Sequence, residues 1–186
     1  ISDKLQEVID EMGKNELRDL DFPFVMADPS QLGCPLIVCS AGFTNLTGYS
    51  AWEAVGRTAA FQLCGVPSHL VCKEQCGEVT KFLDYASRGQ FYEGRDHLGK
   101  EAGYLTEGEL ITVQTYTRRS GELFRCMTYL KQVELEDKMF VIGLQARVPD
   151  PTIDPEEHDG EAAEDKPAAR LALAFSRLNK NMDIAV

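Results

Sequence analysis

Apolar positions along the chain change from helical to strand-like spacing and back. Residues 1–12 place apolar side chains every three or four positions with charged side chains between them, which predicts an amphipathic helix. Two short apolar runs follow at 22–27 and 35–40, separated by turn-forming residues. These runs predict a β-hairpin.

Helical signals dominate the next part of the chain. Residues 41–47 end at Gly48, and residues 50–53 have the sequence of a capping box, so we expect two short helices here. The apolar spacing over 69–87 predicts a longer helix. Residues 90–108 are rich in glycine and dispersed charges without periodicity, and they predict a long loop.

Three segments rich in β-branched and aromatic residues lie beyond this loop, at 110–118, 123–134 and 138–148. The turns between them are short, so they predict an antiparallel meander. The acidic, proline-containing segment 149–167 is typical of a linker. An apolar stripe in 168–186 predicts a C-terminal amphipathic helix.

The expected organisation is one α+β domain over 22–148, with a helix and linker over 1–21 before it and the linker and helix after it. The sheet should have five antiparallel strands, with short helices on one face. A chain of 186 residues, 44% hydrophobic and 26% charged, is long enough for one buried core plus extensions.

The net charge of the chain bears on whether it binds nucleic acid. The chain has 19 basic and 30 acidic residues, for a net charge of −11, and residues 149–166 contribute seven of these negative charges. This balance predicts no nucleic-acid binding. No apolar run is long enough to span a membrane or to act as a signal peptide. We therefore expect a soluble intracellular protein, organellar if a targeting segment has been removed.

The chain offers little for catalysis or metal binding. Its six cysteines are irregularly spaced and are expected to be free thiols, and only three histidines accompany them. This pattern predicts no zinc site. No histidine or carboxylate is tied to a nucleophile by a known motif, so we expect no catalytic residues and no enzyme activity.

Five segments carry motifs of one known family. They are FVMADP at 24–29, PLIVCSAGFTNLTGYS at 35–50, EAVGR at 53–57, YTRRSGELF at 116–124 and FVIGLQ at 140–145. Together they resemble the light-oxygen-voltage (LOV) subfamily of PAS domains over most of 22–148. The resemblance implies a PAS fold, and flanking helices that pack on the sheet or mediate dimers.

The resemblance fails at the residues that serve flavin chemistry. In LOV domains the Gly-Arg pair is followed by Asn-Cys-Arg-Phe-Leu-Gln, whose cysteine adds to the excited flavin. Residues 58–63 here are TAAFQL. The resemblance therefore places Ala59 at the position of the photoactive cysteine and Ala60 at that of a phosphate-binding arginine. Thr58 and Gln62 fall at neighbouring pocket positions.

Three strand residues complete the pocket positions implied by the resemblance. Thr115 and Cys126 stand where the family usually has asparagines against the flavin ring, and Gln145 matches the glutamine that reports flavin chemistry to the sheet. Gln145 has a simpler interpretation as a sheet residue facing a small polar cavity. We therefore expect no cofactor; the alternative is FMN or another flavin.

The sequence predicts a non-catalytic LOV-like PAS module without cysteinyl-flavin photochemistry. It would bind a protein partner, or another copy of itself, through its sheet face and flanking helices, because an uncovered apolar stripe favours association. One alternative is a flavin- or small-ligand-binding sensor that signals through Gln145. Another is a structural subunit of a larger assembly.

Overall fold

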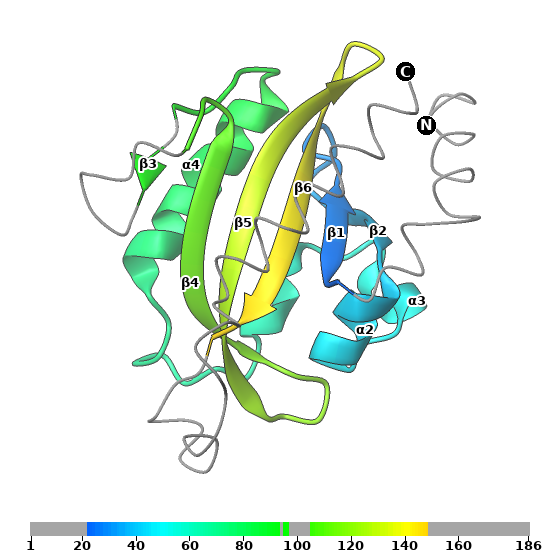
Figure 1. The fold of residues 1–186 in the computed structure, drawn as a ribbon, viewed down its shortest axis with the longest axis vertical. Helices are drawn as coiled ribbons and strands as arrows, with labels where there is room; N and C mark the ends of the chain where they lie inside the picture. Colours follow the sequence, from blue (N-terminus) through cyan, green and yellow to red (C-terminus); the bar gives the residue numbers. More distant parts are fainter. Residues whose placement is uncertain (1–21, 94, 97–104, 149–186) are drawn as a thin grey trace.

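The computed structural model describes residues 22–93, 95–96 and 105–148, and these form one sheet with helices on one side (Figure 1). The elements in chain order are β1 (Phe24–Ala27), β2 (Leu36–Cys39), α2 (Ala41–Thr47), α3 (Ala51–Ala54), η1 (Ala59–Leu63), α4 (Lys73–Ser87), β3 (Arg95–Asp96), β4 (Glu109–Thr117), β5 (Leu123–Leu135) and β6 (Lys138–Arg147).

The sheet has the strand order β2-β1-β6-β5-β4-β3. The first five strands are antiparallel to their neighbours, which confirms the predicted five-stranded sheet. The sixth strand, β3, was not predicted, because it lies in the segment 90–108 that the sequence assigns to a loop. It has two residues and pairs in parallel with β4, with Arg95 opposite Leu110. A strand this short has no alternation to detect.

The N-terminal strand β1 lies second from one edge of the sheet, between β2 and β6. Val25 pairs with Gly143 of β6, and a Cβ atom at Gly143 would lie 2.8 Å from Val25 Cγ2. The absence of a side chain at this position therefore lets the Val25 side chain pack directly over β6.

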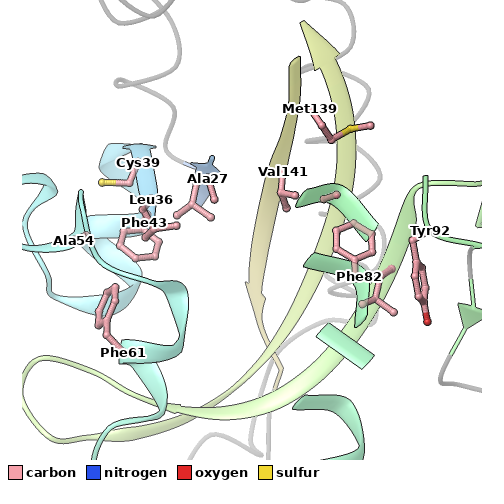
Figure 2. Close-up of a cluster of buried hydrophobic side chains, with 13 residues drawn as sticks. Ala27, Leu36, Cys39, Phe43, Ala54, Phe61, Phe82, Tyr92, Met139 and Val141 are labelled. Carbon is pink, nitrogen blue, oxygen red and sulfur yellow. The ribbon is translucent and has the colours of Figure 1, made fainter. Parts of the chain in front are cut away.

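The inner face of the sheet packs against the helices. Figure 2 shows its buried side chains in two groups, one around α2, α3 and η1 and another where α4 meets the sheet. Phe43 and Phe61 belong to the first group, and Phe82 and Val141 to the second. Phe43 and Phe82 are fully buried, so each group has an aromatic anchor.

Side chains fix the starts of the two short helices as predicted. Ser40 caps α2, because its hydroxyl accepts a hydrogen bond from the Phe43 amide at 3.1 Å. Ser50 and Glu53 form the capping box of α3, and Glu53 also pairs with Arg119 of the β4–β5 turn at 2.8 Å. Gly48 ends α2 with a φ of 76°, which favours glycine.

The long helix starts later than predicted. The apolar spacing predicts a helix from residue 69, whereas α4 begins at Lys73. The Gln114 side chain binds the backbone of Cys72, accepting from its N–H at 3.1 Å and donating to its carbonyl at 2.8 Å. This amide holds the backbone at Cys72, one residue before α4 begins. Local apolar spacing cannot predict such a tertiary contact, so it could not predict where the helix starts.

Several predictions concern segments outside the described residues. They are the helix and linker over 1–21, the linker over 149–167 and the helix over 168–186. All six cysteines lie in the described part of the chain, where none of them forms a disulfide. None of the described helices combines the length and apolar character that crossing a membrane requires.

Phe82 provides a test of the inner core. We expect Phe82→Ala to lower the free energy of unfolding by about 3–5 kcal/mol, because it removes a fully buried ring between α4 and the sheet. Tyr85→Ala on the same helix is the matched control. Tyr85 is 40% exposed, so its loss should cost about 1 kcal/mol. Urea denaturation measures both; equal losses would contradict this packing.

Candidate functional site

A cavity of about 270 Å³ lies between the helices and the inner face of the sheet. Its wall combines residues of β1, β2, η1, α4, β4, β5 and β6 with residues of the loops before η1. The lining residues are Val25, Ala27, Cys34, Leu36, Thr58, Ala59, Ala60, Leu63, Cys76, Val79, Thr80, Leu83, Gln114, Tyr116, Leu130, Val141 and Gly143. The described residues thus line a mostly apolar space where the two groups of core side chains meet, and this space opens to solvent where the lining residues Thr58, Ala59, Ala60 and Thr80 are exposed.

The start of η1 forms one side of the cavity. Thr58, Ala59 and Ala60 all line it, as the sequence analysis expects for the first two. The chain is held here by β2: the Leu36 amide donates to the Arg57 carbonyl at 2.9 Å, and the Gly56 amide donates to the Leu36 carbonyl at 2.8 Å. The Ala59 methyl group is therefore fixed at the cavity wall by backbone pairing.

Gln114, and not Thr115, is the β4 residue on the cavity side. Gln114 and Tyr116 line the cavity, and successive strand residues point to opposite faces, so Thr115 faces away from it. Gln114 is paired across the strands with Cys126, which is fully buried. Thr115 pairs instead with Arg125, so the structure does not bring Thr115 together with the other predicted site residues.

Gln62 and Gln145 are joined by a buried hydrogen bond. The Gln145 Nε2 atom donates to Gln62 Oε1 at 3.0 Å, and the two residues are 3% and 2% exposed. The remaining atoms of the two amides, Gln62 Nε2 and Gln145 Oε1, have no hydrogen-bond partner. Neither glutamine lines the cavity; Leu63, the next residue, does.

The ionisable groups near the cavity are held neutral by burial. Burial raises the pKa of the Cys126 thiol to about 12, and it raises the pKa of the Cys34 thiol to about 12, with the charge of Asp28 adding to the shift. Burial also raises the pKa of the Tyr116 hydroxyl well above its usual range. These groups therefore remain protonated at physiological pH.

Sequence comparison relates the chain to plant photoreceptors. It is 37% identical over 93 residues to phototropin-2 of Oryza sativa subsp. japonica, covering 50% of this chain and 9% of that protein. Over 107 residues it is 29% identical to phototropin-1A of the same plant, covering 55% of this chain and 10% of that protein. The chain thus spans about a tenth of the length of these relatives. No protein-family model matches it.

Solved structures with the same fold are light receptors of the LOV kind. The LOV domain of the Erythrobacter litoralis EL346 blue-light-activated histidine kinase matches with a TM-score of 0.53 and 20% identity, over 70% of this chain and 99% of that one. An RNA-binding LOV receptor matches with a TM-score of 0.55 and 18% identity, over 80% of this chain and 35% of that one. This chain contains a PAS domain of the LOV type.

The cavity of this LOV domain fits a flavin nucleotide poorly. By the resemblance, Gln145 would bind the flavin ring, but its amide nitrogen is already bound to Gln62. Gln114, on the cavity face opposite Cys126, gives both amide atoms to the Cys72 backbone. No lining residue carries a charge that could meet a phosphate, because Ala60 stands where the family has arginine. A bound isoalloxazine needs several free donors and acceptors, which this wall does not present.

Two features of the site were missed by sequence reasoning. The resemblance assigns Thr115 to the pocket, whereas Gln114 is the β4 residue that lines the cavity. The pairing of Cys126 with Gln114 could be predicted from the sequence only if the length of the β4–β5 turn were known. The thiols of Cys34 and Cys76 also line the cavity, and no motif marks them. Among the described residues, no cluster of side chains could hold a metal ion.

The buried amide pair can be tested by a double-mutant cycle. We expect Gln62→Leu to lower the free energy of unfolding by about 1–3 kcal/mol, because it leaves the whole Gln145 amide buried without a partner. The double variant Gln62→Leu/Gln145→Leu should recover most of this loss, since no buried amide remains. Chemical denaturation measures each variant. Additive losses would show that the two side chains are not coupled.

Proposed function

We propose that this chain is a non-enzymatic LOV-type PAS module that acts through protein contacts, without cysteinyl-flavin photochemistry. The observation that carries the proposal is the Ala59 methyl group at the cavity wall, at the position of the family's photoactive cysteine. A methyl group cannot form the thioether bond. By the resemblance, Ala60, Thr115 and Cys126 also replace residues that contact the flavin in the family, which supports a wider loss of flavin contacts.

The other thiols are poor substitutes for the missing one. Cys126 is fully buried and lies outside the cavity lining, and Cys64 is exposed and also outside it. Cys34 lines the cavity, but it lies on the loop before β2 and not on η1. Its raised pKa also keeps the thiol protonated. A cysteine adduct of the family's kind therefore has no candidate at the start of η1.

The outer face of the sheet supports a role in protein contacts. It carries a second apolar cluster, whose buried members are Phe24, Met26, Tyr129, Val133, Phe140, Ile142, Leu144 and Ala146. Within the described part of the chain, no helical residue belongs to this cluster. An apolar sheet face of this extent favours a cover. We propose that a flanking helix of this chain, a second copy or a partner protein supplies it.

The names of the structural neighbours suggest two activities that we do not transfer. One neighbour is a histidine kinase and another binds RNA. This chain has a net charge of −11, which disfavours binding to phosphates. The described residues contain no metal-binding cluster and no assembled nucleophile, so we propose that it acts neither as an enzyme nor on nucleic acid.

A second candidate function is a small-ligand sensor that signals through Gln145. One observation favours it: the Gln145 Oε1 atom is buried and has no hydrogen-bond partner, which leaves it able to accept one from a ligand. A flavin such as FMN is the family's ligand. Binding would first have to break the hydrogen bond between Gln62 and Gln145.

Visible absorption separates these functions. We expect the chain purified from flavin-replete cells to show no flavin absorption band, and Ala59→Cys to gain neither the band nor light-dependent bleaching. The reason is that the thiol restores only one of several lost contacts. An absorption spectrum before and after blue light measures both. A flavin band in the parent chain, or bleaching in Ala59→Cys, would contradict the proposal.

A charged substitution on the outer face of the sheet tests whether a helix or a protein partner covers that face. Met127 is partly buried and packs against the outer cluster. We expect Met127→Glu to release the cover and to increase binding of the dye ANS several-fold, since apolar surface becomes exposed. Ser120→Glu, in the exposed β4–β5 turn, is the control with the same charge change. Light scattering then shows whether the cover is a second copy. Unchanged dye binding in Met127→Glu would argue against a docked cover.

A further inference from the structure

We infer that the inner cavity binds a small, neutral, apolar molecule of about two fused rings in place of a flavin nucleotide. The inference rests on the flavin-free part of the proposed function. It concerns the cavity between η1, α4 and the sheet, for which the proposed function names no ligand.

The size of the cavity sets the size of the ligand. An apolar cavity of about 150 Å³ in a protein core is large enough to take up benzene. The cavity here has about 270 Å³, so it would hold a molecule larger than benzene. It is below the range of about 300–1,000 Å³ that drug-sized ligands and cofactors occupy. A bicyclic aromatic or alicyclic molecule fits between these limits.

The residues that line the cavity disfavour a charged ligand. None of the seventeen lining residues is acidic, basic or histidine. The two groups in the wall whose pKa shifts, Cys34 and Tyr116, are both held in the neutral form by burial. A carboxylate, a phosphate or an ammonium group placed against the sheet, away from the open side of the cavity, would therefore lose its hydration without gaining a charged partner, which disfavours a charged ligand.

The polar side chains of the wall are mostly engaged elsewhere. Gln114 directs its amide to Cys72 and also donates to the Cys76 sulfur at 3.2 Å. Thr80 donates its hydroxyl to the Cys76 carbonyl at 2.9 Å. Apart from Cys34, Thr58 and Tyr116, the rest of the lining is aliphatic and includes Ala59 and Leu63 from η1, Val79 and Leu83 from α4, and Leu130 and Val141 from the sheet. These surfaces favour apolar contact over hydrogen bonding.

The position of the cavity links its occupancy to the helices. Its wall takes residues from both core groups of Figure 2, including Ala27 and Leu36 from one and Val141 from the other. A ligand would fill the space between them and add contacts to η1 and α4 at the same time. Binding should therefore stabilise the folded domain, since only the folded state forms the cavity.

Naphthalene is the probe for this inference, with FMN as the comparison. At about ten times its Kd, we expect naphthalene to raise the melting temperature by about 5 °C. Ala59→Phe should abolish this shift, because the ring fills the cavity from η1, and Ala59→Leu should reduce it. Ala51→Phe, at an exposed alanine of α3, should leave the shift unchanged.

The cavity thiol gives a second readout that needs no variant. Cys76 lines the cavity, whereas Cys64 is exposed outside it. Naphthalene should slow alkylation of Cys76 several-fold, as followed by mass spectrometry, and should leave Cys64 unaffected. No melting shift, or a shift that survives Ala59→Phe without protection of Cys76, would overturn the inference. Tighter binding of FMN than of naphthalene would overturn the proposed function as well, so the two failures are distinguishable.

Discussion

The pairing of β1 with β6 is the constraint on which the rest of the domain depends. It joins residues 24–27 to residues 141–144 and so attaches the N-terminal hairpin to the three long strands, with β2 at the edge of the sheet. Because Gly143 has no side chain, Val25 can pack over β6 there. The sheet that results has two apolar faces, and the helices of the described chain contribute to the cluster on one face only. The inner cavity and the outer contact face both follow from this arrangement.

The changes at the cavity form one physical set. Residue 62 is glutamine and residue 63 is leucine, the reverse of the family's Leu-Gln order. With this order the Gln62 amide lies in the core and the Leu63 side chain lines the cavity. Gln145 then finds its partner in Gln62. Ala59, Ala60 and Leu63 thus give this side of the cavity an apolar lining, while the Gln62 amide lies in the core.

The order of strands and helices could be predicted from the sequence because each element has a local signal. The three long strands are rich in β-branched and aromatic residues, Gly48 ends a helix, and the Ser50 capping box starts one. The start of α4 could not be predicted, since it depends on Gln114, which is 42 residues from Cys72. The resemblance assigns Thr115 to the pocket without fixing the strand register, and in a strand a shift of one residue reverses the face of every side chain, so that Gln114 lines the cavity instead.

The hydrogen bond between Gln62 and Gln145 also has an evolutionary consequence. A return to the family's residue order at positions 62 and 63 would have to pass through sequences in which the Gln145 amide is buried and unpaired. Single substitutions along that path lower stability before any flavin contact is regained. The amide pair thus couples positions 62 and 145, so that neither glutamine can be exchanged for an apolar residue alone without a loss of stability.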